Sequence, residues 1–153
     1  MIMDIINVLR RSDLTHGLTD SEIEDLAKIF HSKHAKKGDV IIREGDPSSE
    51  LYIISKGRVG VLIYSSSQPG EKEKITTLRD NDIFGEFSMI DGTSRSATVV
   101  TDEDSDFIYV DYLDFHRYLE ENEHVGFFIM RNIAKILTAK LRMMNFEVRN
   151  AIL

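Results

Sequence analysis

The sequence predicts a mainly β fold of the α+β class, in which an antiparallel β-roll is flanked by helices. From Lys37 onward, residues of high β propensity occur in short runs rather than in long helical periods. These runs are VII (40–42), LYII (51–54), VGVLIY (59–64), ITTL (75–78), SATVV (96–100) and DFIYV (106–110). The stretches between them, such as KKGD, EGDPSS and SSSQPGEK, are rich in turn-forming residues. Short strands joined by tight turns, with few helices between them, indicate an antiparallel sandwich or barrel rather than a parallel sheet.

Helical patterns occupy both ends of the chain. Near the N-terminus, a short helix is expected over Ile2 to Arg10, and Thr19-Asp-Ser-Glu22 reads as a capping box that opens an amphipathic helix. After Asp111 the pattern is helical again, first in YLDFHRYLEEN and then in a long run from Val125 to about Asn150. We therefore expect one domain over 1–153, with N-terminal helices in 1–36, a β-roll in 37–111 and C-terminal helices in 112–153.

The long C-terminal run carries a heptad seam, because its apolar residues are spaced alternately by four and three. The seam consists of Met130, Ala134, Leu137, Leu141, Met144, Val148 and Ala151. A second apolar stripe of Ile129, Ile133 and Ile136 lies on a neighbouring face. One stripe can pack on the β-roll and the other on a partner helix, which favours a homodimer. A monomer whose helix has one wide buried face is the alternative.

Composition excludes several function classes. The chain of 153 residues has no apolar run long enough to span a membrane and no recognisable secretory signal, so a cytoplasmic location is expected. It has no cysteine, which rules out disulfides, thiolate catalysis and iron–sulfur clusters. Its net charge of −7 argues against nucleic-acid binding by this chain alone.

The stretch FGEFSMIDGTSRSATV, residues 84–99, has the residue types that hold an anion. Gly85 allows close approach of the backbone, and Glu86 to Met89 can form a helical turn whose amides are free to bind an anion. Arg95 can reach back across this turn with its forked guanidinium group. The Glu86 carboxylate only accepts hydrogen bonds and so suits a ribose hydroxyl. With the acid for the sugar and the arginine for the phosphate, the pair indicates a nucleotide ligand. The alternative is that Arg95 and Glu86 simply pair with each other across the turn.

Two motifs resemble the cyclic nucleotide-binding domain family. The first is Gly85-Glu86-x-Ser88-Met89 followed by Arg95-Ser96-Ala97-x-Val99-x-Thr101, similar to the phosphate-binding cassette of that family. The second is Gly38-Asp39-Val40-Ile41, Glu44-Gly45-Asp46 and Leu51-Tyr52-x-Ile54-x-x-Gly57-x-Val59-x-Val61, which resembles its first strands and turns. The chain is similar to the sensor domain of bacterial catabolite activator-type regulators from about Leu14 to Val148.

This resemblance implies an eight-stranded β-roll of jelly-roll (double-stranded β-helix) topology, with C-terminal helices that move on ligand binding. It implies that Arg95 binds the phosphate and Glu86 the ribose 2′-hydroxyl. The amides of Phe87, Ser88, Ser96 and Ala97, next to Gly85, would complete the phosphate cradle. The purine would lie near Ile75, Thr76, Met144 and Asn145. The ligand is expected to be cAMP rather than cGMP, and the output a signal through the C-terminal helix.

Other functions remain open at this point. Regulators similar to this chain carry a helix-turn-helix domain after the long helix, and none is present before Leu153. The chain is thus a stand-alone sensor with an unknown effector protein, or the sensor fragment of a transcription regulator, channel or kinase. A ligand-free β-roll that binds proteins is the competing class. We expect no enzyme, no prosthetic group and no metal site, since His31-x-x-His34 lacks a third ligand nearby in the sequence.

Overall fold

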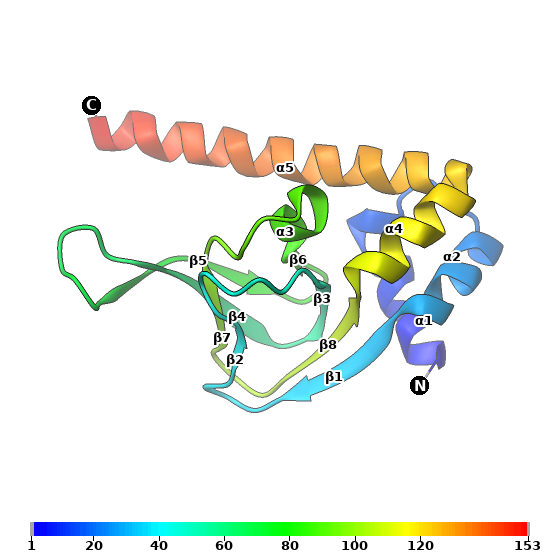
Figure 1. Ribbon diagram of the computed structural model, residues 1–153, viewed down its shortest axis with the longest axis horizontal. Helices are drawn as coiled ribbons and strands as arrows, with labels where there is room; N and C mark the ends of the chain where they lie inside the picture. Colours follow the sequence, from blue (N-terminus) through cyan, green and yellow to red (C-terminus); the bar gives the residue numbers. More distant parts are fainter. Residues whose placement is uncertain (1, 153) are drawn as a thin grey trace.

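Two four-stranded antiparallel sheets form the centre of the molecule, in the strand orders β1-β8-β3-β6 and β2-β7-β4-β5. The computed structural model describes residues 2–152. Helices cover one end of the roll, and the long C-terminal helix passes over α3 (Figure 1). The helices are α1 (Ile2–Arg11), η1 (Asp13–Thr15), α2 (Asp20–Leu26), η2 (Ala27–Ile29), α3 (Glu86–Asp91), α4 (Tyr112–Glu121) and α5 (Glu123–Ile152). The strands are β1 (His31–Ala35), β2 (Val40–Ile42), β3 (Leu51–Lys56), β4 (Arg58–Tyr64), β5 (Lys72–Arg79), β6 (Ile83–Phe84), β7 (Thr98–Thr101) and β8 (Ser105–Val110).

The architecture confirms the predicted eight-stranded roll, but two of its strands are not visible as β-prone runs. Strand β1 begins at His31, before the expected start of the roll at residue 37. Its sequence HSKHA has no β-branched residue, and it is a strand because it pairs with β8 from His31↔Tyr109 to Ala35↔Ser105. The other unexpected strand, β6, has two residues and pairs with β3. In both cases the partner strand determines the conformation.

The N-terminal helices begin where the sequence predicts. Thr19 caps α2, with its amide donating to Glu22 Oε1 at 2.9 Å and the Glu22 amide donating to Thr19 Oγ1 at 3.2 Å. The cap places Ile23 and Leu26 on the buried face of α2. This face joins the larger of two apolar cores, which is shared by the helices and the outer side of the β1-β8-β3-β6 sheet.

The smaller core fills the interior of the roll and is rich in aromatic side chains. Tyr52 stacks on Phe84 with ring centroids 4.9 Å apart, and Phe107 packs edge-on against both rings. Since Phe84 directly precedes Gly85, this stack fixes the chain where the predicted anion-binding segment begins.

Helix α5 has an anchored first half and an exposed second half. Ile129 and Ile133 are buried in the larger core, and the buried side chain of Asn132 donates to the carbonyls of Leu14 at 2.8 Å and His16 at 2.9 Å. From residue 141 to 152 every residue is exposed, and this part continues past α3 on the side of the β4–β5 hairpin (Figure 1). Within residues 2–152, none of the helices has the length and apolar character needed to cross a membrane.

The heptad seam is therefore divided between two environments. Its early members Met130 and Leu137 pack against the larger core, whereas Leu141, Met144 and Val148 are more than half exposed. The Ile129–Ile133–Ile136 stripe packs on the body, as predicted for one of the two stripes.

Replacement of Asn132 tests the anchor of α5. Asn132→Leu leaves two carbonyl oxygens without their donor, so we expect the free energy of unfolding to fall by about 1–3 kcal/mol. Asn150→Leu, on the exposed half of the same helix, is the control and should change it by less than about 0.5 kcal/mol. Urea denaturation followed by circular dichroism measures both. Equal losses in the two variants would contradict the anchoring role.

Candidate functional site

Two glycines in the left-handed conformation delimit the short helix α3 of the predicted anion site. Gly85 precedes the helix with φ 83° and Gly92 follows it with φ 69°. The predicted helical turn over Glu86 to Met89 is confirmed, and the helix continues to Asp91. No side-chain hydrogen bond caps its N-terminus, so the first N–H groups of α3 can donate to another acceptor.

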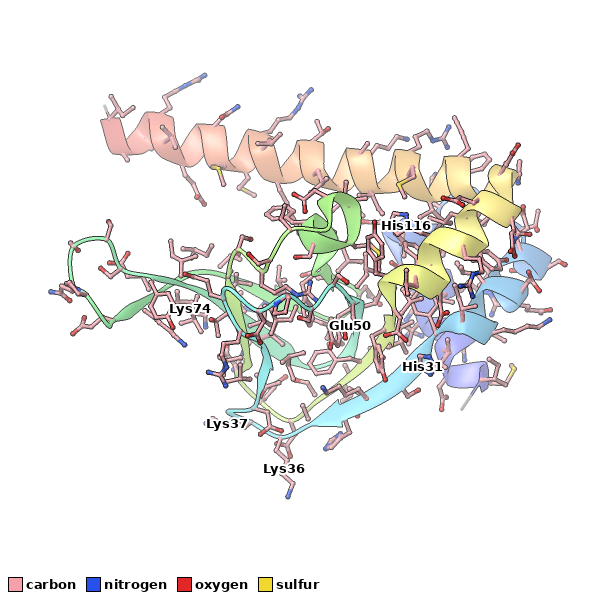
Figure 2. The ribbon with its side chains drawn as sticks, in the orientation of Figure 1. His31, Lys36, Lys37, Glu50, Lys74 and His116 are labelled. Atoms are coloured by element: carbon pink, nitrogen blue, oxygen red, sulfur yellow. The ribbon has the colours of Figure 1, made fainter. Side chains whose placement is uncertain are left out.

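Arg95 is buried and gives its guanidinium to four acceptors. Its side chain is 2% exposed. The Nε atom donates to Ser48 Oγ at 3.0 Å, and Nη1 donates to the Gly85 carbonyl at 3.2 Å. The Nη2 atom donates to the Glu50 carbonyl at 2.8 Å and to the Glu50 carboxylate at 3.2 Å. Figure 2 shows Glu50 beneath α3, and its side chain is half-buried. Arg95 thus reaches back to the start of α3, as the sequence predicts.

Burial and charge act against each other at this arginine. Desolvation lowers the pKa of Arg95, and the nearby Glu50 carboxylate opposes that change. Burial raises the pKa of Tyr52 to about 12, and the charge of Glu50 adds to this increase. Arginine stays protonated in proteins, so the site holds a desolvated positive charge whose present counter-ion is a carboxylate.

The backbone of Arg95 brings the two sequence motifs together. The Arg95 amide donates to the Asp46 carbonyl at 2.9 Å, and the Gly45 amide donates to the Arg95 carbonyl at 2.8 Å. Beside this bridge, the Glu44 amide donates to the buried hydroxyl of Thr98 at 3.0 Å. The turn at residues 43–46 therefore holds the segment that carries Arg95.

Glu86, at the first position of α3, is 3% exposed and pairs with Lys140 of α5. The interpretation that Arg95 and Glu86 pair with each other is therefore wrong, because Arg95 pairs with Glu50 and Glu86 with Lys140. The two charged groups face the same region but are held by different elements.

The other predicted site residues differ in exposure. Ser88 is buried, Ala97 is half-buried, and Phe87 and Ser96 are exposed. The predicted purine contacts Ile75 and Thr76 are exposed on β5, and Met144 and Asn145 are exposed on the second half of α5.

Sequence reasoning missed Ser48, Glu50 and Lys140. Ser48 and Glu50 belong to the turn between β2 and β3, which reads only as a turn signal. Lys140 is one of several basic residues along α5, and nothing in its local sequence distinguishes it. Each contacts the site from more than 40 positions away, a relation that only the fold establishes.

A separate group of His31, Asp111 and Asp114 gathers where β1 meets α4, with one ligand atom of each within 4.8 Å of the others. Both histidines of His31-x-x-His34 lie on strand β1, and His34 pairs with Asp106 at 2.7 Å. All three members of the group are exposed, which is the ordinary setting of solvated polar side chains, and the group carries no metal assignment.

Comparison with known proteins places this geometry in a known family. The family model described as cyclic nucleotide-binding domain matches residues 32–122, which is more than half of the chain and extends from β1 to the end of α4. The chain is 33% identical over 108 residues to Rap guanine nucleotide exchange factor 3 of Homo sapiens, and 28% identical over 143 residues to the cyclic AMP receptor protein of Thermus thermophilus. The first alignment covers 69% of this chain and the second 92%.

The chain spans 11% of the length of the human relative and 62% of the length of the Thermus protein. Among solved structures, a cyclic nucleotide-binding domain from Methylobacillus flagellatus superposes with a TM-score of 0.87. That alignment covers 99% of this chain and 84% of the other at 24% sequence identity, so it concerns the fold.

The two glycines that flank α3 allow a matched test of the site's packing. A Cβ at Gly85 would lie 2.6 Å from the Glu50 carbonyl oxygen and 2.9 Å from Arg95 Nη1, whereas one at Gly92 would meet open space. We expect Gly92→Ala to lower the free energy of unfolding by about 1–2 kcal/mol, the cost of the left-handed conformation. Gly85→Ala should lower it by about 1–3 kcal/mol more through overpacking. Equal losses in urea denaturation would contradict the close approach at Gly85.

Proposed function

Because the chain belongs to the cyclic nucleotide-binding domain family, we propose that the Arg95–Glu86 site binds a cyclic nucleotide, with cAMP preferred over cGMP. The observation that carries this proposal is a buried guanidinium directed at the N-terminal end of α3, with a buried carboxylate on the first residue of that helix. The domain is a regulatory binding module and performs no catalysis itself.

The cyclic phosphate exchanges with Glu50 at Arg95. A cyclic phosphodiester carries one negative charge, as the Glu50 carboxylate does, so the buried cation keeps a counter-ion throughout. A phosphate also accepts from the forked donors of arginine and from free amides at a helix N-terminus. The amides of Phe87 and Ser88 in α3, and of Ser96 and Ala97 after Arg95, supply those donors in this proposal.

The ribose and the base are recognised by other groups. Glu86 accepts a hydrogen bond from the ribose 2′-hydroxyl. An ionised carboxylate suits this role because it only accepts hydrogen bonds. The purine lies against Ile75 and Thr76 of β5 and is covered by Met144 and Asn145 of α5. One relative is named for cyclic AMP and another, 32% identical over 97 residues, is a cGMP-dependent protein kinase, so the titration below decides the preference.

The effect of nucleotide binding is transmitted through α5, whose exposed second half carries apolar side chains. Leu141, Met144 and Val148 continue a seam at alternating spacings of three and four, a pattern typical of helices that pair. A second copy of the chain covers this seam, and the nucleotide alters how the two helices pack. The effector that reads this change is another protein or another segment of a longer chain.

Calorimetric titration with cAMP and with cGMP tests the proposed ligand. We expect micromolar or tighter binding of cAMP, weaker binding of cGMP, and no measurable binding at micromolar concentration in Arg95→Ala. Each charge-assisted hydrogen bond contributes about 1.5–3 kcal/mol, so loss of the guanidinium reduces affinity by at least about 10–100-fold. Arg95→Lys should also bind weakly, since it keeps the charge but loses the fork.

Arg43→Ala, which alters an exposed arginine in the turn that holds Arg95, is the control and should bind as the unaltered protein does. Urea denaturation establishes that each variant is folded before titration. Unchanged affinity in Arg95→Ala would contradict its role. Failure of the unaltered protein to bind either nucleotide would favour a ligand-free protein-interaction module in which Arg95 and Glu86 stay paired with Glu50 and Lys140.

Sedimentation velocity tests the seam. Leu141→Glu/Val148→Glu places charges on the exposed seam, and we expect it to convert a dimer into a monomer. Ala139→Glu/Phe146→Glu adds the same charges at the same spacing on the opposite face of the helix and should stay dimeric. A monomeric unaltered protein, or a dimeric seam variant, would contradict pairing through α5.

A further inference from the structure

The acceptors around the Arg95 guanidinium are of two kinds. Three of them are neutral oxygens, namely the Ser48 hydroxyl and the carbonyls of Gly85 and Glu50. The fourth is the Glu50 carboxylate, which accepts from Nη2 at 3.2 Å. Because the carboxylate alone carries a charge, it is the acceptor that an incoming anion replaces, and the three neutral acceptors stay in position.

The main chain of Glu50 keeps its carboxylate close to the site after such a replacement. The Glu50 carbonyl accepts from the same Nη2 atom at 2.8 Å, and a Cβ at Gly85 would lie 2.6 Å from this carbonyl oxygen. The backbone of residue 50 is thus packed against Arg95 and the start of α3. The Glu50 side chain is 32% exposed, so its carboxylate can turn toward solvent while the residue itself stays beside the guanidinium.

The charge of Glu50 also acts on groups other than Arg95. Burial raises the pKa of Tyr52 to about 12, and the negative charge of Glu50 adds to this increase. Glu86, buried at the start of α3, is a second carboxylate of the same site. With Arg95 paired to Glu50 and Glu86 to Lys140, the formal charges of these four side chains cancel. Each negative charge that a ligand brings is therefore an excess charge near two carboxylates.

Phosphate groups differ in the charge that they bring. A cyclic phosphodiester carries one negative charge, whereas a phosphate monoester, whose second pKa is about 6, carries nearly two at neutral pH. The energy of two interacting charges is proportional to their product, so the same carboxylate repels the dianion twice as strongly as the monoanion. The attraction of the dianion to Arg95 is also doubled, but Glu50 offsets it.

We propose that Glu50 determines the charge specificity of the site, so that the site accepts phosphodiesters with one negative charge and rejects dianionic monoesters such as 5′-AMP. This inference rests on the proposed function and adds to it a residue that discriminates between ligands. Arg95 alone attracts both kinds of phosphate, and the dianion more strongly. Glu50 removes that advantage, because it stays beside the guanidinium and repels each ligand in proportion to its charge.

The first experiment uses the unaltered protein and two linear nucleotides that differ by one charge. 5′-AMP is a dianion well above its second pKa of about 6, and its phosphate methyl ester is a monoanion with the same sugar and base. In calorimetric competition against cAMP, the ester should bind about tenfold more tightly than 5′-AMP, the effect of one unit charge near a partly exposed carboxylate. Binding of 5′-AMP as tightly as the ester, or no competition by the ester at millimolar concentration, would overturn the inference.

The second experiment removes the charge of Glu50. Glu50→Gln keeps the shape of the side chain, and its effect should increase with the charge of the ligand. We expect cAMP to bind about tenfold more tightly and 5′-AMP about a hundredfold, whereas uncharged adenosine should bind as it does to the unaltered protein. Glu120→Gln, at an exposed position on α4, removes the same charge away from the site and is the matched control, with no change expected for any of the three ligands.

Equal gains for cAMP and 5′-AMP in Glu50→Gln, or no gain for cAMP, would overturn the charge specificity. Absence of cAMP binding in the unaltered protein and in both variants would instead overturn the proposed function. Urea denaturation establishes that Glu50→Gln is folded, and if it is not, the two linear nucleotides decide the inference in the unaltered protein.

Discussion

The burial of the Arg95 guanidinium is the constraint on which the rest of the site depends. A desolvated cation needs acceptors for its donors, and here they come from separate parts of the chain: Ser48 and Glu50 before β3, and the Gly85 carbonyl after β6. Glycine is required at position 85 because a side chain there would collide with the Glu50 backbone and with Arg95 itself. The arginine therefore organises the loops around it before any ligand is considered.

The groups suited to a nucleotide are neutralised by the protein's own charges. Arg95 pairs with Glu50, and Glu86 pairs with Lys140. This arrangement avoids buried unpaired charges in the free protein. Under the proposed function, binding is therefore an exchange of partners rather than the filling of a vacant site. Glu50 belongs to the loop before β3 and Lys140 to α5, so the two counter-charges come from different elements.

Much of this organisation could be predicted from the sequence, because its determinants are local. The capping box at Thr19, the α3 turn and the glycines around it depend on neighbouring residues, and the structure has them as expected. Strand β1 could not be predicted, since its polar sequence becomes a strand only by pairing with β8. The partners of Arg95 and Glu86 were equally hidden, because Glu50 and Lys140 lie 45 and 54 residues away from them and carry no local signal.

A crystal structure of the protein with cAMP tests the exchange of partners most directly. The account predicts the cyclic phosphate within hydrogen-bond distance of Arg95, the ribose 2′-hydroxyl on Glu86, and the side chains of Glu50 and Lys140 withdrawn from these two residues. A nucleotide bound elsewhere, or bound at this site with the Glu50–Arg95 and Lys140–Glu86 pairs intact, would contradict it.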